Sequence, residues 1–268
     1  MLFDIRDEQR AAETLERFTG VNKKIWLIEK YKNARRIDYS NVNKDIENLI
    51  LENEGCFPNL KDIEMVVTHI TTSSNKCISI IDNGLLDLVG SYNLLESEIR
   101  EFLDENDIHI DTDSAMLYYK GQCINVSYGK YPMDTGSKRY KAWSVGRKFY
   151  YDFTICGFLS ISDSDVYEGN VHKRPEILAD IDFLLGTKLQ HKWILNHKPY
   201  EIVFVIPEVH TVYNGCDDES DYEKVMSYLI MAYECICLGP HTIEILCKNN
   251  IKVHPSQILE CNEFSKWE

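Results

Sequence analysis

The chain has 268 residues, of which 44% are hydrophobic and 27% charged, and its formal net charge is −14. This length accommodates one large domain, or one domain with a smaller appendage. Nonspecific nucleic-acid binding draws its affinity from Lys and Arg side chains that meet phosphates, so the acidic charge argues against a general DNA or RNA coat. The same charge leaves room for a local basic cleft and is consistent with a basic partner.

Neither a membrane anchor nor a metal site is indicated by the sequence. No apolar run reaches the ~20 residues that cross a bilayer, and residues 1–10 carry acids without an apolar core, unlike a signal peptide. The nine cysteines are scattered and no two have CxxC spacing. We therefore expect reduced thiols in a cytoplasmic protein, with no metal and no membrane segment.

The first 58 residues predict a helical N-terminal segment. Good helix formers fill residues 7–18, and Gly20 closes that stretch. Residues 21–36 are amphipathic, and Ser40 or Asn41 is placed to cap a third helix that runs to Leu51. Two interpretations stay open for this segment: a layer that braces the main domain, or a module that senses or binds a partner.

Residues 59–268 mix predicted strands and helices without the regular alternation of a parallel βαβ sheet, which favours an α+β fold. The turn pair Lys120-Gly121 between two short alternating stretches predicts a hairpin. The predicted strands cover residues 65–70, 115–119, 122–128, 145–153, 156–161, 200–206 and 234–238, with short ones at 251–253 and 257–259. The predicted helices cover residues 75–82, 96–106, 175–189, 221–232 and 241–249.

Several catalytic signatures do not occur in the sequence. There is no GxGxxG, GxxxxGK[ST], HExxH or GxSxG motif, which argues against a Rossmann dehydrogenase, a P-loop NTPase, a zincin and an α/β-hydrolase. A cysteine nucleophile paired in space with a histidine stays open, because such pairing leaves no local pattern.

Two segments combine apolar stretches with a functional group. The apolar stretch 65–70 brings His69 close to its end, where hydroxyl side chains follow and Gly84 ends a short helix. An imidazole in that position is placed to hydrogen-bond a sugar or a phosphate. Glu234 begins the apolar stretch 234–238, and an acid in a buried strand needs a partner or a role. The alternatives are a His69 bonded to a neighbouring strand and a Glu234 exposed without a role.

These segments, His69-Ile70-Thr71 with Ile80 and Gly84-Leu85, and Glu234 leading a later strand, resemble the ADP-ribosyltransferase superfold. The likeness is to poly(ADP-ribose) polymerases and bacterial toxin-type transferases, over residues 60–260. It implies a split antiparallel or mixed sheet at residues 59–268 and NAD as a substrate. It further implies that His69 binds the adenosine ribose, that Thr71 supports it, and that Glu234 is the catalytic acid, which stabilises an oxocarbenium-like sugar.

The resemblance also calls for an aromatic ring against the nicotinamide and for cations near the phosphates. Several residues are candidates for each role, and packing or surface positions are the alternative for all of them. The candidates for the ring are Tyr128, Tyr131, Tyr150 and Tyr151, and those for the phosphates are Arg174 and Lys138-Arg139.

Two functions follow as expectations, and whether the chain is an enzyme is left open. The resemblance implies an NAD-dependent transferase that moves ADP-ribose to a macromolecular acceptor, in a toxin or phage-defence setting. The alternative is a non-catalytic binding or sensor protein on the same scaffold that recognises a protein partner. A metal-dependent nuclease ranks last because no cluster of acids and histidines supports it.

Overall fold

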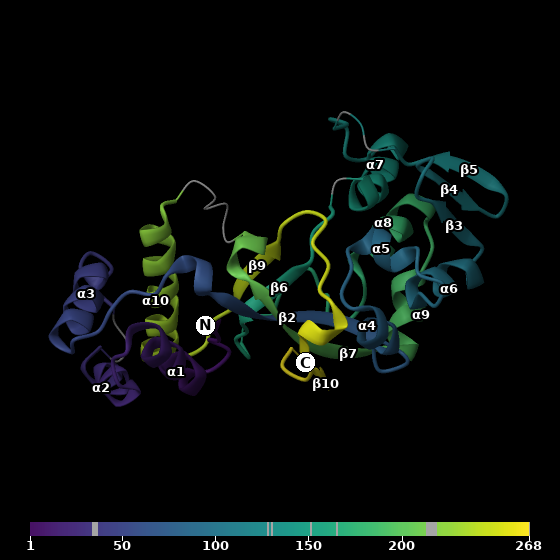
Figure 1. The fold of residues 1–268 in the computed structure, drawn as a ribbon. Coiled ribbons are helices and arrows are strands. Elements are labelled where there is room, and N and C mark those ends of the chain that lie inside the picture. The colour runs from purple at the N-terminus through teal and green to yellow at the C-terminus, as the bar shows by residue number, and fades with distance from the viewer. Residues whose placement is uncertain are drawn as a thin grey trace. The chain divides into compact units, whose positions relative to one another are not determined.

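The structure is a computed structural model that describes residues 1–33, 37–127, 129, 131–150, 152–164, 166–212 and 219–267 (Figure 1). The chain forms two compact units, each built from three separate segments. The first consists of Met1–His69, Cys156–Val166 and Val203–Cys247, and the second of Ile70–Ile155, Tyr167–Ile202 and Lys248–Glu268. Helices and mostly antiparallel strands occur together, so the α+β prediction is confirmed.

The first unit is organised around antiparallel strands. β2 (Glu64–Ser73) pairs with β6 (Cys156–Ser160), β6 with β9 (Ile243–Cys247), and β9 with β8 (Thr211–Val212). The short strand β1 (Leu2–Phe3) is parallel to β2. Four consecutive residues of β2, from Met65 to Thr68, are buried, which explains why its sequence is a continuous apolar run.

The N-terminal helices form where the sequence predicts helices. They are α1 (Glu8–Thr19), α2 (Lys23–Asn33) and α3 (Val42–Glu52). Gly20 ends α1 with φ +75°, the left-handed geometry that glycine adopts at low cost. These helices pack against α10 (Asp221–Leu238), and the rings of Trp26 and Tyr233 lie 6.3 Å apart. The first unit therefore continues past the predicted boundary at residue 58.

Helix α10 replaces a predicted strand. The sequence predicts a helix that stops at Ala232 and a strand that starts at Glu234, but the helix is continuous to Leu238. Ser220 begins it with a capping box to Glu223, and ten of its residues are buried. The stretch 233–238 is therefore helical, and four of its six residues, Tyr233, Cys235, Ile236 and Cys237, are buried. Its apolar residues are also typical of strands, and periodicity over so few residues does not distinguish the two.

The region after α10 is predicted as a helix but forms a strand. Residues 241–249 predict a helix, but the structure has strand β9 there. Ile243, Ile245 and Cys247 are buried, while the residues between them are exposed. This alternation is the period of a strand with one covered face, which pairs on one side with β6 and on the other with β8.

The second unit contains a three-stranded antiparallel sheet and a group of helices. Its strands are β3 (Ile108–Asp111), β4 (Met116–Tyr119) and β5 (Gln122–Asn125), and Lys120 and Gly121 form the predicted hairpin turn, both with positive φ. The second unit also contains β10 (Ile258–Glu263) and the first five residues of β7 (Lys198–Pro207), which is next to β10 in strand order. The helices are α4 (Ile78–Asn83), α5 (Leu88–Tyr92), α6 (Glu98–Glu105), α7 (Lys138–Tyr150), α8 (Glu176–Leu185) and α9 (Leu189–Asn196).

Helix α7 corrects the strand predicted over residues 145–153. Val145 and Phe149 are four residues apart and both are buried, so they belong to one helical face. They join a core of α6, α8, α9 and the small sheet that includes Leu103, Leu117 and Trp193. The sequence favours a strand here because Val145 and a group of aromatic residues from Phe149 to Phe153 are typical of strands.

Candidate functional site

His69 lies in β2 of the first unit. Its Nδ1 donates a hydrogen bond to the backbone carbonyl of Cys156 at 2.8 Å, on the neighbouring strand β6. Burial lowers the pKa of His69, and the bond to the carbonyl opposes that shift in part. The structure thus contains the hydrogen bond to a neighbouring strand that the sequence left as an alternative. Thr71 lies two residues further along β2 and is half-buried.

Glu234 is in the interior of α10, so the prediction that it begins a strand is wrong. Its carboxylate lies 3.7 Å from Nε2 of His241, and the side chain is 14% exposed. A hydrogen bond to Glu234 is the main cause that raises the pKa of Tyr39, with burial second. Among the described residues, Glu234 therefore contacts Tyr39 and His241, and the structure does not bring its side chain into contact with His69.

Two further predicted site residues, Arg174 and Tyr131, belong to the second unit and make local contacts there. Arg174 donates to the side chain of Gln190 at 2.7 Å and to the carbonyl of Gly169 at 2.8 Å, which holds the local chain. Tyr131 is 48% exposed and contacts other rings near α7. Tyr128 and Tyr151 lie outside the described residues.

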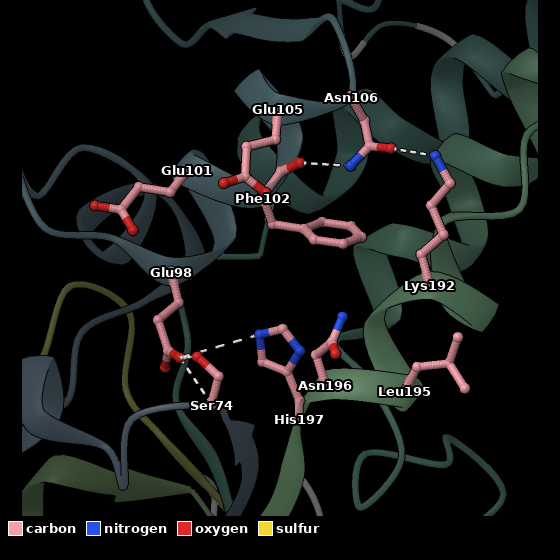
Figure 2. Close-up of a pocket in the computed structure, with 10 residues that line it drawn as sticks. All are labelled: Ser74, Glu98, Glu101, Phe102, Glu105, Asn106, Lys192, Leu195, Asn196 and His197. Carbon is pink, nitrogen blue, oxygen red and sulfur yellow. Dashed lines mark hydrogen bonds and ion pairs between the residues drawn. The ribbon is translucent and has the colours of Figure 1, made fainter.

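A pocket of about 490 Å³ in the second unit is a candidate site (Figure 2). Residues of α6 and α9 line it, together with Ser74, which directly follows β2. Ten residues line it: Ser74, Glu98, Glu101, Phe102, Glu105, Asn106, Lys192, Leu195, Asn196 and His197.

Helix periodicity places the α6 side chains in this pocket. Glu98, Glu101, Phe102 and Glu105 follow the i, i+3, i+4, i+7 spacing of one helical face. The helix begins at Ser97, whose hydroxyl accepts from the backbone of the third helical residue, and Ile99 and Leu103 anchor the opposite face in the core. Three carboxylates therefore project from one side of a short helix.

Glu98 is fixed by three hydrogen bonds. Its Oε1 accepts from the backbone N–H of Ser74 at 2.8 Å and from the Ser74 hydroxyl at 2.6 Å. Its Oε2 accepts from the Ser73 hydroxyl at 2.7 Å. These donors hold the carboxylate in one orientation, and its side chain is only 17% exposed.

His197 faces Glu98 from the C-terminal end of α9. Its Nδ1 donates to the carbonyl of Trp193 at 2.8 Å, because a carbonyl oxygen only accepts. Nε2 lies 4.0 Å from Oε1 of Glu98 (Figure 2). Burial lowers the pKa of His197, while the Trp193 carbonyl and the Glu98 charge oppose the shift. In its neutral form the ring thus presents a lone pair toward a carboxylate.

Aromatic rings form one wall of the pocket. The ring of His197 stacks on Trp193, and the edge of Phe102 meets Trp193 with centroids 4.9 Å apart. Trp193 is 1% exposed, and its Nε1–H donates to Oγ1 of Thr72 at 2.8 Å. The stacked pair is therefore rigid, and the exposed part of Phe102 supplies apolar surface beside the acids.

The rim of the pocket is acidic. Glu101 and Glu105 are exposed on α6, and the single cation of the lining, Lys192, already donates to the side-chain oxygen of Asn106 at 2.5 Å. The amide of Asn106 in turn donates to the carbonyl of Phe102 at 2.8 Å. The three carboxylates of the lining outnumber its one ammonium, so the pocket attracts cations.

The sequence predicted a helix over residues 96–106, where α6 lies, but singled out none of the residues that line the pocket. The spacing of Glu98, Glu101 and Glu105 with Phe102 is the signal that could have indicated a polar pocket face. His197 has no comparable local signal, because its role depends on the packing of α9 against α6.

Comparisons by family model, by sequence against characterised proteins and by structure against solved structures found no match for this chain. Within the described residues, no group of three or more His, Cys, Asp or Glu side chains is arranged to hold a metal ion. None of the described helices is both long and apolar enough to cross a membrane.

Proposed function

We propose that this protein is a binding protein whose α6–α9 pocket takes a positively charged side chain of a protein partner. The observation that carries the proposal is the pair formed by Nε2 of His197 and Oε1 of Glu98, 4.0 Å apart. When His197 is neutral both atoms are acceptors, and a ligand group with two or more N–H donors satisfies both. An ammonium or guanidinium group provides these donors and also neutralises Glu98.

The rest of the lining fits the same ligand class. Phe102 offers a ring beside the carboxylate, and cations are attracted to aromatic faces. Glu101 and Glu105 at the rim favour a second positive charge on the approaching segment. The chain as a whole carries a charge of −14, which increases the rate of encounter with a basic partner.

The direction of the hydrogen bonds between Ser74, Glu98 and His197 favours ligand binding over hydrolysis. A serine nucleophile requires a histidine that takes its proton. Here the hydroxyl of Ser74 donates to Glu98, and the carboxylate stands between the serine and His197. Ser74 is therefore a residue that positions Glu98, and not a nucleophile activated by His197.

The proposal is tested by calorimetric titration with hexaarginine and hexalysine, and with hexaglutamate as the charge-reversed probe. We expect the basic peptides to bind and the acidic one to show no binding. Glu98→Gln keeps the shape of the side chain and removes its charge. A charge-assisted hydrogen bond contributes about 1.5–3 kcal/mol, so the substitution is expected to weaken binding by roughly 10- to 100-fold.

Glu96→Gln is the matched control, because Glu96 is exposed, lies just before α6 and does not line the pocket. It removes the same charge from the same region and is expected to change the affinity less than about 3-fold. Equal losses in the two variants would show that only the overall charge matters, and the pocket would then be rejected as the binding site.

NAD-dependent ADP-ribosyl transfer is the second candidate. The observation that supports it is the bond from Nδ1 of His69 to the Cys156 carbonyl, which leaves Nε2 as the ring atom for a ribose hydroxyl. The catalytic carboxylate of this candidate is open, since Glu234 lies in a helix and contacts His241. Purified protein would release nicotinamide from NAD, and His69→Ala would stop the release. Absence of release from the folded wild-type protein would reject this candidate.

A further inference from the structure

Helix α7 in the second unit is strongly basic in an acidic chain. Five of its thirteen residues are Lys or Arg and none is Asp or Glu. The net charge of the whole chain is negative and argues against a general nucleic-acid coat. The local charge of α7 is positive, so that argument does not apply to this helix. Electrostatic attraction is screened beyond about 8 Å at physiological salt, so the local charge matters most for a ligand in contact with α7.

Most of these cations form no salt bridge with a described residue, although the positive charge of Arg147 acts on Asp180 of α8, where burial raises the pKa of the carboxyl group and Arg147 opposes that rise. Lys148 is paired within the protein, with Glu176 at 2.5 Å and Asp152 at 3.6 Å. The other four enter no ion pair within the described ranges, and three of them are exposed. The four are Lys138, Arg139, Lys141 and Arg147, and the exposed three are Lys138, Arg139 and Arg147.

Aromatic rings lie between the cations. Tyr140 stacks on Trp143 with centroids 5.8 Å apart and planes 30° apart, and Tyr131 meets the edge of Trp143 at 4.8 Å. Phe183 of α8, which packs beside α7 (Figure 1), meets Tyr140 at 6.5 Å and is 44% exposed. Rings are thus gathered at the surface, although large apolar side chains are usually buried.

The cations and rings are interleaved along the helix. The guanidinium of Arg147 lies 5.5 Å from the centre of the Trp143 ring, and the ammonium of Lys141 lies 4.4 Å from that of Phe183. Arg139, Trp143 and Arg147 are spaced by four residues, so they form one stripe about 12 Å long on the helix surface.

We propose that this α7 surface, made of Tyr131, Arg139, Tyr140, Lys141, Trp143 and Arg147, binds single-stranded nucleic acid. Bases stack on exposed rings without sequence preference, and Lys and Arg side chains neutralise the backbone phosphates. Single strands fit better than duplexes because a duplex hides the faces of its bases. The surface is independent of the α6–α9 pocket and does not rest on the function proposed for it.

An anionic membrane is the other polyanion with matching chemistry, and the charge distribution argues against it. A bilayer presents an extended negative plane, which the remaining acidic surface of the protein repels. A single strand follows one helix and meets only the charge near it.

The first experiment measures fluorescence anisotropy with labelled oligo(dT) and oligo(U) of 20 nucleotides, a 20-base-pair duplex and vesicles of phosphatidylserine. We expect both single strands to bind more tightly than the duplex and the vesicles. Three phosphate contacts, from Arg139, Lys141 and Arg147, predict an affinity that falls about 20-fold between 50 and 200 mM salt. Quenching of tryptophan fluorescence on binding would accompany base stacking near Trp143.

The second experiment separates this surface from general charge. The double variant Arg139→Glu/Arg147→Glu is expected to weaken single-strand binding by at least about 10-fold. Lys44→Glu/Lys61→Glu is the matched control, since it reverses two exposed charges in the first unit and is expected to have little effect. Tyr140→Ala tests stacking and is expected to lower the affinity about 10-fold, with Tyr31→Ala, an 83% exposed tyrosine, as its control.

Circular dichroism and thermal unfolding establish that each variant is folded before binding is measured. The proposal is overturned by the absence of single-strand binding at 50 mM salt, or by equal losses in the two double variants. The proposal is also overturned if a duplex or vesicles bind as tightly as a single strand and Tyr140→Ala has an unchanged affinity for the single strand. The surface would then be a general polyanion site.

Discussion

The imidazole of His197 lies flat on the indole of Trp193, with ring centroids 3.5 Å apart and planes only 10° from parallel. The two residues are four positions apart and lie at the end of α9, so the helix itself sets their spacing. Trp193 is also held by Thr72, which accepts from its ring N–H, and by the ring of Phe102, with centroids 4.9 Å apart. The position of the candidate ligand-binding nitrogen therefore depends on one buried tryptophan.

The bond between Trp193 and Thr72 gives a prediction about stability. Thr72→Val leaves the buried N–H of Trp193 without an acceptor, which costs about 1–3 kcal/mol. Trp193→Phe removes the donor and also leaves a small cavity, at a comparable or larger cost. Urea unfolding is expected to show that the double variant loses less than the sum of the two single losses, because the second substitution removes a partner that is already unpaired.

The outcome that contradicts this prediction is strict additivity, which would mean that the bond contributes nothing to folding. Thr71→Val is a suitable control, since Thr71 is the adjacent hydroxyl residue of β2 and is half-buried. Its substitution is not expected to couple to Trp193→Phe.

A buried histidine gives a pH-dependent prediction. His172 is 6% exposed, and neither ring nitrogen has a hydrogen-bond partner among the residues that the structure describes. The ring meets the edge of Trp267. Burial, aided by the nearby charges of Lys173 and Arg174, lowers the pKa of His172 below 6.5. The unfolded chain thus binds a proton at a higher pH than the folded one, so stability is full above pH ~6.5 and falls as the pH drops below that value.

His172→Phe keeps a ring of similar shape and has no nitrogen to protonate. We expect this variant to be at least as stable as the wild type at pH 7.5 and to lose less stability between pH 6.5 and 5. Thermal unfolding across this pH range measures both effects. His191→Phe, at an exposed position of α9, is the control for replacing a histidine. An unchanged pH dependence in His172→Phe would show that other groups cause the acid sensitivity.

The fold is predictable from sequence where one local signal decides. Gly20 at the end of α1 and Lys120-Gly121 in the hairpin act through backbone conformation, which depends on the residues themselves. Glu234 is different, because its neighbours are apolar and aromatic on every side. Only packing against the N-terminal helices reveals that the stretch is a helix.

The candidate site was less predictable than the fold. The sequence directed attention to His69 because an apolar strand precedes it, and that strand exists. The relation between Glu98 and His197 joins residues from two helices far apart in the chain, and neither residue lies in a motif. Such a pair follows from helix packing, which no spacing within one segment encodes.

The cysteines provide a prediction about chemical reactivity. Burial raises the pKa of Cys235 and Cys247 to about 12, so very little thiolate exists at pH 8. Cys56 and Cys123 are exposed. A short pulse of iodoacetamide followed by peptide mapping is expected to label Cys56 and Cys123 first. In denaturant, where burial is lost, Cys235 and Cys247 should be labelled as fast as Cys56 and Cys123. Early labelling of Cys235 in the native protein would contradict the packing of α10.

Gly146 provides the sharpest test of how α7 is held. A Cβ atom at this position would lie 1.6 Å from the carbonyl oxygen of Val126, and 2.8 Å from its carbonyl carbon. Alanine is a better helix former than glycine by about 1 kcal/mol, so helix propensity alone predicts that Gly146→Ala stabilises the protein. The contact is with backbone and cannot be relieved by a side-chain rotation. We therefore expect the steric cost to exceed the propensity gain and to destabilise the protein by more than about 2 kcal/mol.

Gly136→Ala is the matched control, since its nearest contact for a Cβ is an ordinary 3.5 Å to the side chain of Asp134. Chemical denaturation is expected to show a change below about 1 kcal/mol in this control and a large loss in Gly146→Ala. If the helix moved outward instead of the protein losing stability, the α7 surface would also lose its ring contacts with Phe183. A Gly146→Ala variant as stable as the wild type would contradict the close approach of α7 to Val126, and with it the placement of the basic stripe.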